Sequence, residues 1–226
     1  LADYLRRESG AHVDAAQVWV ANGSNEVMHH LFLAFGGPGR LAMTFDPTYS
    51  MYPEYARDTF TAYETVPRRE DFTVDVPAAV AAIVDRRPTL VLLTSPNNPT
   101  GTGVSLDDIR VVAQAALEAG AILVVDEAYA EFRRSGTPSA CELLPEFANL
   151  VVSRTMSKAF ALAGARVGYA VAADAAVVEI LKVVRLPYHL SAVTQAVALT
   201  ALAHADVLQA QVDLLRSERD ALALWL

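Results

Sequence analysis

Short apolar runs alternate with longer amphipathic segments along most of the chain. The runs are rich in β-branched side chains, and they lie at residues 41–45, 61–66, 89–94, 121–126, 149–153 and 167–172. Such runs are typical of strands that are buried on both faces. Amphipathic helices are predicted between several of them, notably over 77–85 and 105–119. The alternation predicts an α/β fold, with a mostly parallel sheet covered by helices on both of its faces.

The helix predicted over 105–119 carries signals at both ends. Ser105 is followed three residues later by Asp108, a spacing that resembles the capping box of a helix N-terminus. Gly120 stands just past the last helical residue, where glycine is favoured because the backbone turns left-handed there. We therefore expect Ser105 to cap this helix and Gly120 to end it.

The last part of the chain is wholly helical in pattern. From about residue 174 onward, helices are predicted over 174–185, 191–204 and 207–226. The first residues also fit a helix already under way, and the pattern is still amphipathic at residue 226. We therefore expect the sequence to be part of a longer protein.

Composition narrows the class of protein. Among the 226 residues, 18 are basic and 26 acidic, which gives a net charge of −8. Without a basic block, this balance argues against nucleic acid or an anionic membrane as the main partner. Cys141 is the single cysteine, so neither an intramolecular disulfide nor a cysteine-rich metal site can form. With no membrane-length apolar stretch and no signal-peptide pattern, we expect a cytoplasmic protein that uses no metal.

Polar residues stand at or just after the ends of four predicted strands. They are Tyr49 after 41–45, Asn98 after 89–94, Asp126 and Tyr129 at the end of 121–126, and Ser157 and Lys158 after 149–153. Each one alone fits a turn, a helix cap or a solvated lysine equally well. Ligands of a parallel sheet bind beyond the carboxyl ends of its strands, so four such groups at one edge predict a functional site.

The order of these groups resembles that of fold-type I enzymes that use pyridoxal 5'-phosphate (PLP). The shared pattern is Asn-Asn-Pro, then Asp-x-x-Tyr, then Ser-Lys, then an arginine eight residues after the lysine. Within that superfamily, SPNNPTG at 95–101, DEAYAEF at 126–132 and RTMSKAFALAGARVGY at 154–169 resemble the histidinol-phosphate aminotransferase family. The likeness runs from VWVANGSNE, which begins at residue 18, to RLPYHLS, which ends at residue 191.

The resemblance implies a role for each strand-end group. Lys158 is the lysine whose amine bonds to the cofactor aldehyde and later moves a proton. Asp126 is the carboxylate that keeps the pyridine nitrogen protonated, so that the ring can accept electrons. Asn98 and Tyr129 donate to the ring 3-oxygen, and Tyr49 stacks on the ring face. Lys158, Asp126 and Tyr129 are thus the expected catalytic residues.

The cofactor phosphate is expected to bind two segments. The first segment is residues 22–26, which precede a helix predicted over 25–35. Its backbone amides can form an anion site at the N-terminus of that helix. The resemblance adds side chains from the lysine segment, including an arginine whose guanidinium can bind two phosphate oxygens. The whole set is Gly23, Ser24, Asn25, Thr155, Ser157 and Arg166.

The family also implies a domain division and a second subunit. Residues 1–205 correspond to the large, PLP-binding domain, and 206–226 to the start of a helix leading to a small C-terminal domain absent from this sequence. Relatives also have an N-terminal arm and a carboxylate-binding arginine in the small domain, and neither occurs in these residues. A homodimer is expected, because the second subunit completes the cofactor site in this family.

The activity implied is transfer of the amino group of histidinol phosphate to 2-oxoglutarate, giving imidazole-acetol phosphate and glutamate in histidine biosynthesis. By the same resemblance, Tyr188 faces the substrate. An aromatic amino-acid aminotransferase or a PLP-dependent threonine-phosphate decarboxylase would show the same cofactor motifs. A PLP-sensing transcription regulator and an inactive truncated domain are further alternatives, the former requiring a basic winged-helix module.

Overall fold

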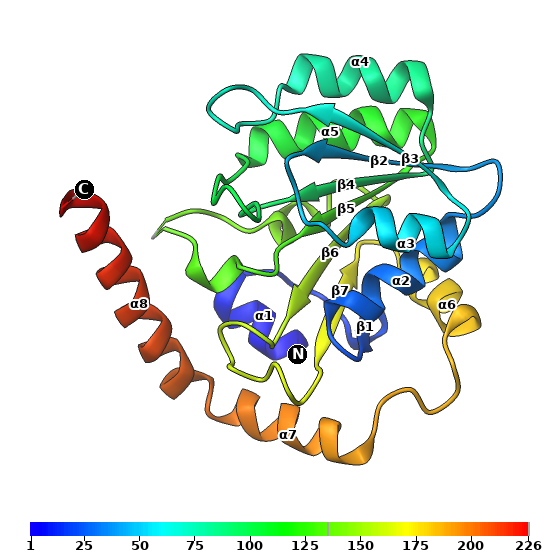
Figure 1. Cartoon of the computed structure of the whole chain (residues 1–226). Coiled ribbons are helices and arrows are strands. Elements are labelled where there is room, and N and C mark those ends of the chain that lie inside the picture. The colour runs from blue at the N-terminus through cyan, green and yellow to red at the C-terminus, as the bar shows by residue number, and fades with distance from the viewer. Residues whose placement is uncertain (135, 226) are drawn as a thin grey trace.

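The computed structural model describes residues 1–134 and 136–225, and a seven-stranded sheet lies at its centre (Figure 1). The strand order is β1-β7-β6-β5-β4-β2-β3. The strands are β1 (Val18–Ala21), β2 (Leu41–Asp46), β3 (Ala62–Pro67), β4 (Leu90–Thr94), β5 (Ile122–Asp126), β6 (Leu150–Thr155) and β7 (Gly168–Ala172). Strands β2 to β6 pair in parallel, whereas β7 runs antiparallel to both of its neighbours. The predicted mostly parallel sheet is confirmed, with each predicted strand within two residues of an observed one.

Eight α-helices occur in the described residues. They are α1 (Ala2–Ser9), α2 (Ser24–Phe35), α3 (Tyr52–Asp58), α4 (Val76–Arg86), α5 (Leu106–Ala119), α6 (Ala175–Val184), α7 (Ala192–Ala203) and α8 (Ala205–Trp225). Strand β1 and helix α3 have no counterpart in the prediction. Both are short, at four and seven residues, and so give little periodic signal.

The central strands are buried because helices cover both faces of the sheet. In β4, Val91 and Leu93 contribute to a hydrophobic cluster with α1, α4 and α5. Leu90 and Leu92 point the other way, into a second cluster with α2, α3 and α6. Side chains alternate between faces along a strand, so a run that is apolar at every position fills both clusters at once.

Both ends of α5 lie where the sequence signals predict them. The Ser105 hydroxyl accepts from the Asp108 N–H at 3.1 Å, and Gly120 adopts φ 77° just past the helix. The capping box itself is only half formed, because the Asp108 carboxylate accepts from the Ser105 hydroxyl at 2.8 Å and not from its backbone N–H. An aspartate is one methylene shorter than the glutamate that usually reaches back.

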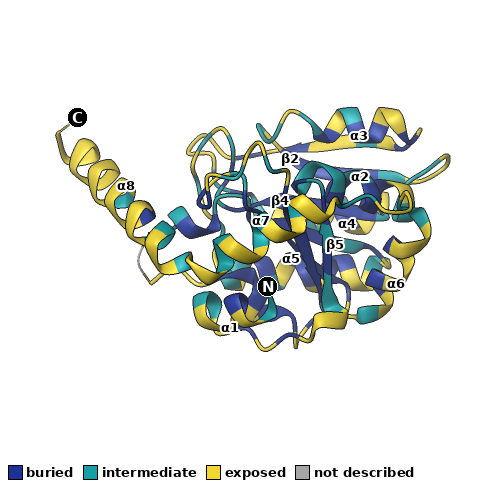
Figure 2. Ribbon diagram, turned by 90° about the horizontal axis from the view of Figure 1, so that it is seen from below, coloured by how far each residue is buried: buried dark blue, intermediate teal, exposed yellow. Residues whose placement is uncertain are grey.

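Helix α8 leaves the body of the molecule, as Figures 1 and 2 show, and is exposed along most of its length. Val212 is its one buried residue among those described. Within the described part of the chain, no helix combines the length and apolar character needed to cross a membrane.

Strand register brings the polar strand ends together. Thr94 at the end of β4 lies opposite Asp126 at the end of β5, and Asp126 lies opposite Ser153 near the end of β6. The segments that follow these strands therefore leave the sheet side by side. This edge of the sheet is where the sequence predicts a site.

Candidate active site

A cavity of about 220 Å³ opens beyond the carboxyl ends of β4, β5 and β6. It is lined by Ser24, Asn25, Tyr49, Thr94, Asn98, Asp126, Ala128, Tyr129, Thr155, Ser157, Lys158, Ala163 and Arg166. Every residue that the sequence predicts to hold the cofactor lines this cavity, except Gly23. Residues from five segments far apart in the chain thus meet in one place, as their positions at strand ends predict.

Gly23 contributes by leaving room for Arg166. It has φ 83°, a left-handed value that favours glycine, and a Cβ built on it would overlap the Arg166 guanidinium. Arg166 donates from Nη2 to the Asn22 carbonyl at 3.2 Å and from Nη1 to the Ala163 carbonyl at 3.1 Å. The guanidinium is thereby fixed beside the N-terminus of α2, where backbone amides also favour an anion.

Asp126 is buried, and its carboxylate accepts two hydrogen bonds. The Tyr52 hydroxyl donates to Oδ2 at 2.7 Å, and the Ala128 N–H donates to Oδ1 at 3.1 Å. Burial raises the pKa of Asp126 from 3.8 to about 6, while both hydrogen bonds act to lower it. The carboxylate is therefore poised to hold a buried cation, which would stabilise its charged form.

Tyr52 is a site residue that the sequence analysis missed. It is fully buried, and besides Asp126 its hydroxyl contacts Thr94 Oγ1 at 2.9 Å. Its ring meets that of Tyr49 edge-on, with centroids 5.5 Å apart, and the Tyr49 hydroxyl donates to Asn25 Oδ1 at 3.3 Å. Its only sequence signal was its spacing of three residues from Tyr49, which is weak because two neighbouring aromatic residues do not by themselves indicate a site.

Lys158 is exposed and lies beside the aromatic wall of the cavity. Its Nζ is 5.4 Å from the centroid of the Tyr129 ring, within the range of a cation–π contact. The Tyr129 hydroxyl accepts from Asn98 Nδ2 at 3.5 Å. On the other side, the Thr155 hydroxyl accepts from the Ser157 N–H at 3.1 Å and so shapes the turn that carries the lysine.

A buried ionic network lies on the opposite face of β6 from Thr155. Arg154 is fully buried, and its guanidinium donates to Glu127 at 2.8 Å, to Ser139 at 2.9 Å and to Glu8 at 2.9 Å. Glu131 lies 3.5 Å from the same guanidinium, and burial raises the pKa of Glu131. Arg154 comes four residues before Lys158, and Glu127 directly follows Asp126. The network therefore ties together the two strand ends that carry the lysine and the aspartate.

The comparisons with known proteins agree with this geometry. Residues 1–226 match the family model described as aminotransferase class I and II. The chain belongs to this family.

Individual relatives are similar over the whole chain. It is 56% identical to a histidinol-phosphate aminotransferase of Bifidobacterium longum, over 100% of this chain and 60% of the relative. It is 59% identical to that of Thermobifida fusca, over 100% of this chain and 59% of the relative. The chain thus spans about 60% of the length of these curated relatives.

Solved structures share the fold of this chain. Histidinol-phosphate aminotransferase from Sinorhizobium meliloti, in complex with pyridoxal-5'-phosphate, has a TM-score of 0.84 at 28% identity, covering 94% of this chain and 56% of that one. Aspartate aminotransferase from Thermus thermophilus with maleate has a TM-score of 0.86 at 28% identity, covering 96% of this chain and 57% of that one.

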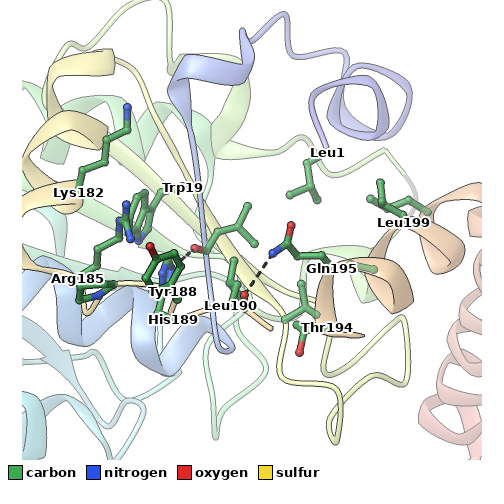
Figure 3. A pocket seen from close by; sticks show the side chains of 15 residues that line it. Leu1, Trp19, Lys182, Arg185, Tyr188, His189, Leu190, Thr194, Gln195 and Leu199 are labelled. Atoms are coloured by element: carbon green, nitrogen blue, oxygen red, sulfur yellow. Dashed lines mark hydrogen bonds between the residues drawn. The ribbon is translucent and has the colours of Figure 1, made fainter. Parts of the chain in front are cut away.

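Tyr188, the residue predicted to face the substrate, does not line the candidate site. It lies instead at a separate apolar cavity of about 750 Å³ beside β1 and α7, where its side chain is 96% exposed (Figure 3). Its neighbour His189 packs inward, stacked on Trp19 with ring centroids 5.4 Å apart and bonded to the Val20 carbonyl at 2.9 Å. With φ 57° at Tyr188, the backbone turns there, so the two adjacent side chains diverge.

The raised pKa of Asp126 predicts a pH-dependent cost to stability in the cofactor-free protein. The native state binds the proton more tightly than the unfolded state, so stability falls as pH rises from about 4 to about 6, and the full cost remains above that. A shift from 3.8 to about 6 corresponds to about 3 kcal/mol. Relative to wild type, Asp126→Asn should therefore gain up to about that much between pH 4 and pH 7, measured by urea unfolding.

Asp71 provides a control of opposite sign. It is exposed, and hydrogen bonds from Thr73 lower its pKa, so Asp71→Asn should lose stability relative to wild type as pH rises. If the difference in unfolding free energy between Asp126→Asn and wild type stayed constant with pH, the pKa of Asp126 would not be raised by burial, and the account of this site would be wrong.

Proposed function

We propose that this chain forms the cofactor-binding part of a PLP-dependent aminotransferase acting on histidinol phosphate and 2-oxoglutarate. The products would be imidazole-acetol phosphate and glutamate, and the role would be in histidine biosynthesis in the cytoplasm. The observation that carries the proposal is that Lys158, Asp126 and Arg166 meet in one cavity. Identities of 52–59% to histidinol-phosphate aminotransferases favour this substrate over others.

The residues present fit PLP at each of its polar ends. Lys158 is the lysine in the cavity, and its amine would bond to the aldehyde. Asp126 would face the pyridine nitrogen. The positive charge of the protonated ring would stabilise the buried carboxylate in its ionised form. Arg166, which the missing side chain of Gly23 allows to lie beside the N-terminus of α2, would bind the phosphate. Ser24, Asn25, Thr155 and Ser157 would complete that phosphate site.

The bound cofactor supplies an electron sink for the electron pair left at the substrate Cα when its proton is removed. Lys158 Nζ would take that proton from the Cα of the amino donor and return one to the Cα of the acceptor. Asp126 would hold its negative charge through both half-reactions, oriented by the Tyr52 hydroxyl and the Ala128 N–H. Asn98 and Tyr129, which contact each other, would hold the ring 3-oxygen from one side.

A homodimer is part of the proposal. Large apolar side chains are exposed on and after the C-terminal turn of α6, with Val183 at 82%, Leu186 at 75% and Tyr188 at 96% exposure. Apolar surface of this kind is typical of contact faces. We place the large domain at residues 1–205, with α8 following it.

The alternatives share the same cavity chemistry, so the amino donor has to be tested directly. With the full-length protein and 2-oxoglutarate as acceptor, we expect kcat/KM for histidinol phosphate to exceed that for phenylalanine or tyrosine by at least about tenfold. Faster turnover of the aromatic amino acids would favour the aromatic aminotransferase. Release of carbon dioxide from phosphothreonine would favour the decarboxylase.

A further inference from the structure

A second cavity, of about 680 Å³, adjoins the active site. Asn98 and Tyr129 line both cavities, so the two cavities are direct neighbours. One wall is formed by the loop over 95–103, and Arg219 of α8 lines it as well. The position fits a substrate whose reacting amine lies at Lys158 and whose far end extends toward α8.

The walls of this second cavity are strongly cationic. They include Arg133, Arg134 and Arg219, and no acidic residue occurs among the described residues that line it. The chain as a whole has a net charge of −8, so a lining whose charged residues are all basic is a local departure from its composition. A concave site with charge of one sign attracts a ligand of the opposite sign.

The three arginines differ in how far they are paired with acidic residues of the protein. Arg133 donates to Glu8 at 2.8 Å and lies 3.6 Å from Glu127, so it belongs to the buried ionic network. Arg219 is held over the cavity by a 2.6 Å hydrogen bond to the Phe132 carbonyl and pairs with exposed Asp220. Arg134 is exposed and has no ion-pair partner among the described residues.

We propose that this cavity binds the anionic far end of the substrate, a phosphate monoester or a carboxylate, through Arg134 and Arg219. A guanidinium presents parallel N–H donors that match either group. The assignment rests on the proposed function, because it takes Lys158 as the reacting end. The assignment also extends the proposed function, because it places on the large domain a subsite that selects for a negatively charged substrate.

The test measures anion binding to the full-length holoprotein, in which PLP already fills the phosphate site beside Arg166. Inorganic phosphate and glutarate are titrated by calorimetry into wild type, Arg134→Gln, Arg219→Gln and the double variant. The double variant should weaken binding of at least one anion by at least about tenfold, because the loss of even one charge-assisted hydrogen bond has about that effect. Arg216→Gln, one turn earlier on the same helix and outside this cavity, is the matched control.

The two anions distinguish the source of the charge. Weaker phosphate binding together with a raised KM for histidinol phosphate assigns the subsite to the phosphate of the donor. Weaker glutarate binding with a raised KM for 2-oxoglutarate assigns it to the carboxylate of the acceptor. Unchanged binding of both anions in the double variant overturns the proposal. Because calorimetry needs no turnover, this outcome is separate from any failure of histidinol phosphate as a substrate.

Discussion

Replacing Lys158 by alanine should lower the rate of amino transfer by roughly 10⁴-fold, at the upper end of what one acid–base group contributes. The same Nζ would both bond to the cofactor and move the substrate proton, so no second group can take over either task. The measurement is kcat of the full-length protein with its best amino donor and 2-oxoglutarate.

The sequence offers an unusually clean control, because Lys182 is its one other lysine. Lys182 lies on α6, half-exposed, and pairs with Glu179 on the same helix. Lys182→Ala should therefore leave kcat within about twofold, since exposed ion pairs contribute little. A Lys158→Ala protein that retains a tenth of wild-type turnover would refute the catalytic role of Lys158.

Arg154→Met should reduce the free energy of unfolding by about 3–5 kcal/mol, the usual cost of leaving buried charges without their partner. The change would strand Glu127 and Glu131, both nearly fully buried, together with Glu8. Urea unfolding of the full-length protein measures the loss, and Glu127→Gln combined with Arg154→Met should recover part of it.

The matching surface variant is Arg110→Met. Arg110 pairs with Glu146 and Asp107, but all three side chains are substantially exposed, so the expected loss is at most about 1 kcal/mol. Equal losses for Arg154→Met and Arg110→Met would mean that the buried network does not hold the β5 and β6 strand ends together.

The positions of Lys158, Asp126 and Asn98 could be predicted because each depends on local signals. A buried strand followed by a polar residue fixes which end of the strand that residue occupies, and parallel strands place those ends at one edge. The structure agrees, since Thr94 and Asp126 lie side by side at the ends of adjacent strands.

Tyr52 and Arg154 could not be predicted in the same way. The Tyr52 hydroxyl meets Asp126 because α3 packs against one face of the sheet, 74 residues away along the chain. Arg154 directly follows the strand predicted over 149–153, and its partner Glu8 lies 146 residues away along the chain. Contacts of this kind depend on tertiary packing, which leaves no periodic trace in the sequence.

Tyr188 lies apart from the other candidate residues, and its role toward the substrate stays a prediction. Its segment follows α6 and runs past β1, on the side of the molecule that holds the apolar cavity. The turn at Tyr188 directs His189 inward against Trp19 and leaves the tyrosine exposed. Tyr188 has φ 57°, a value that is uncommon for residues other than glycine, and the sequence carries no signal for it.

The central claim, that Lys158 is the residue that binds the cofactor covalently, is tested most directly by chemical trapping. The full-length protein is loaded with PLP, reduced with borohydride and digested, and the peptides are sequenced by mass spectrometry. The structure predicts a pyridoxyl group on the peptide that contains Lys158 and none on the peptide that contains Lys182. A pyridoxyl group on Lys182, or on neither lysine of this chain, would contradict it.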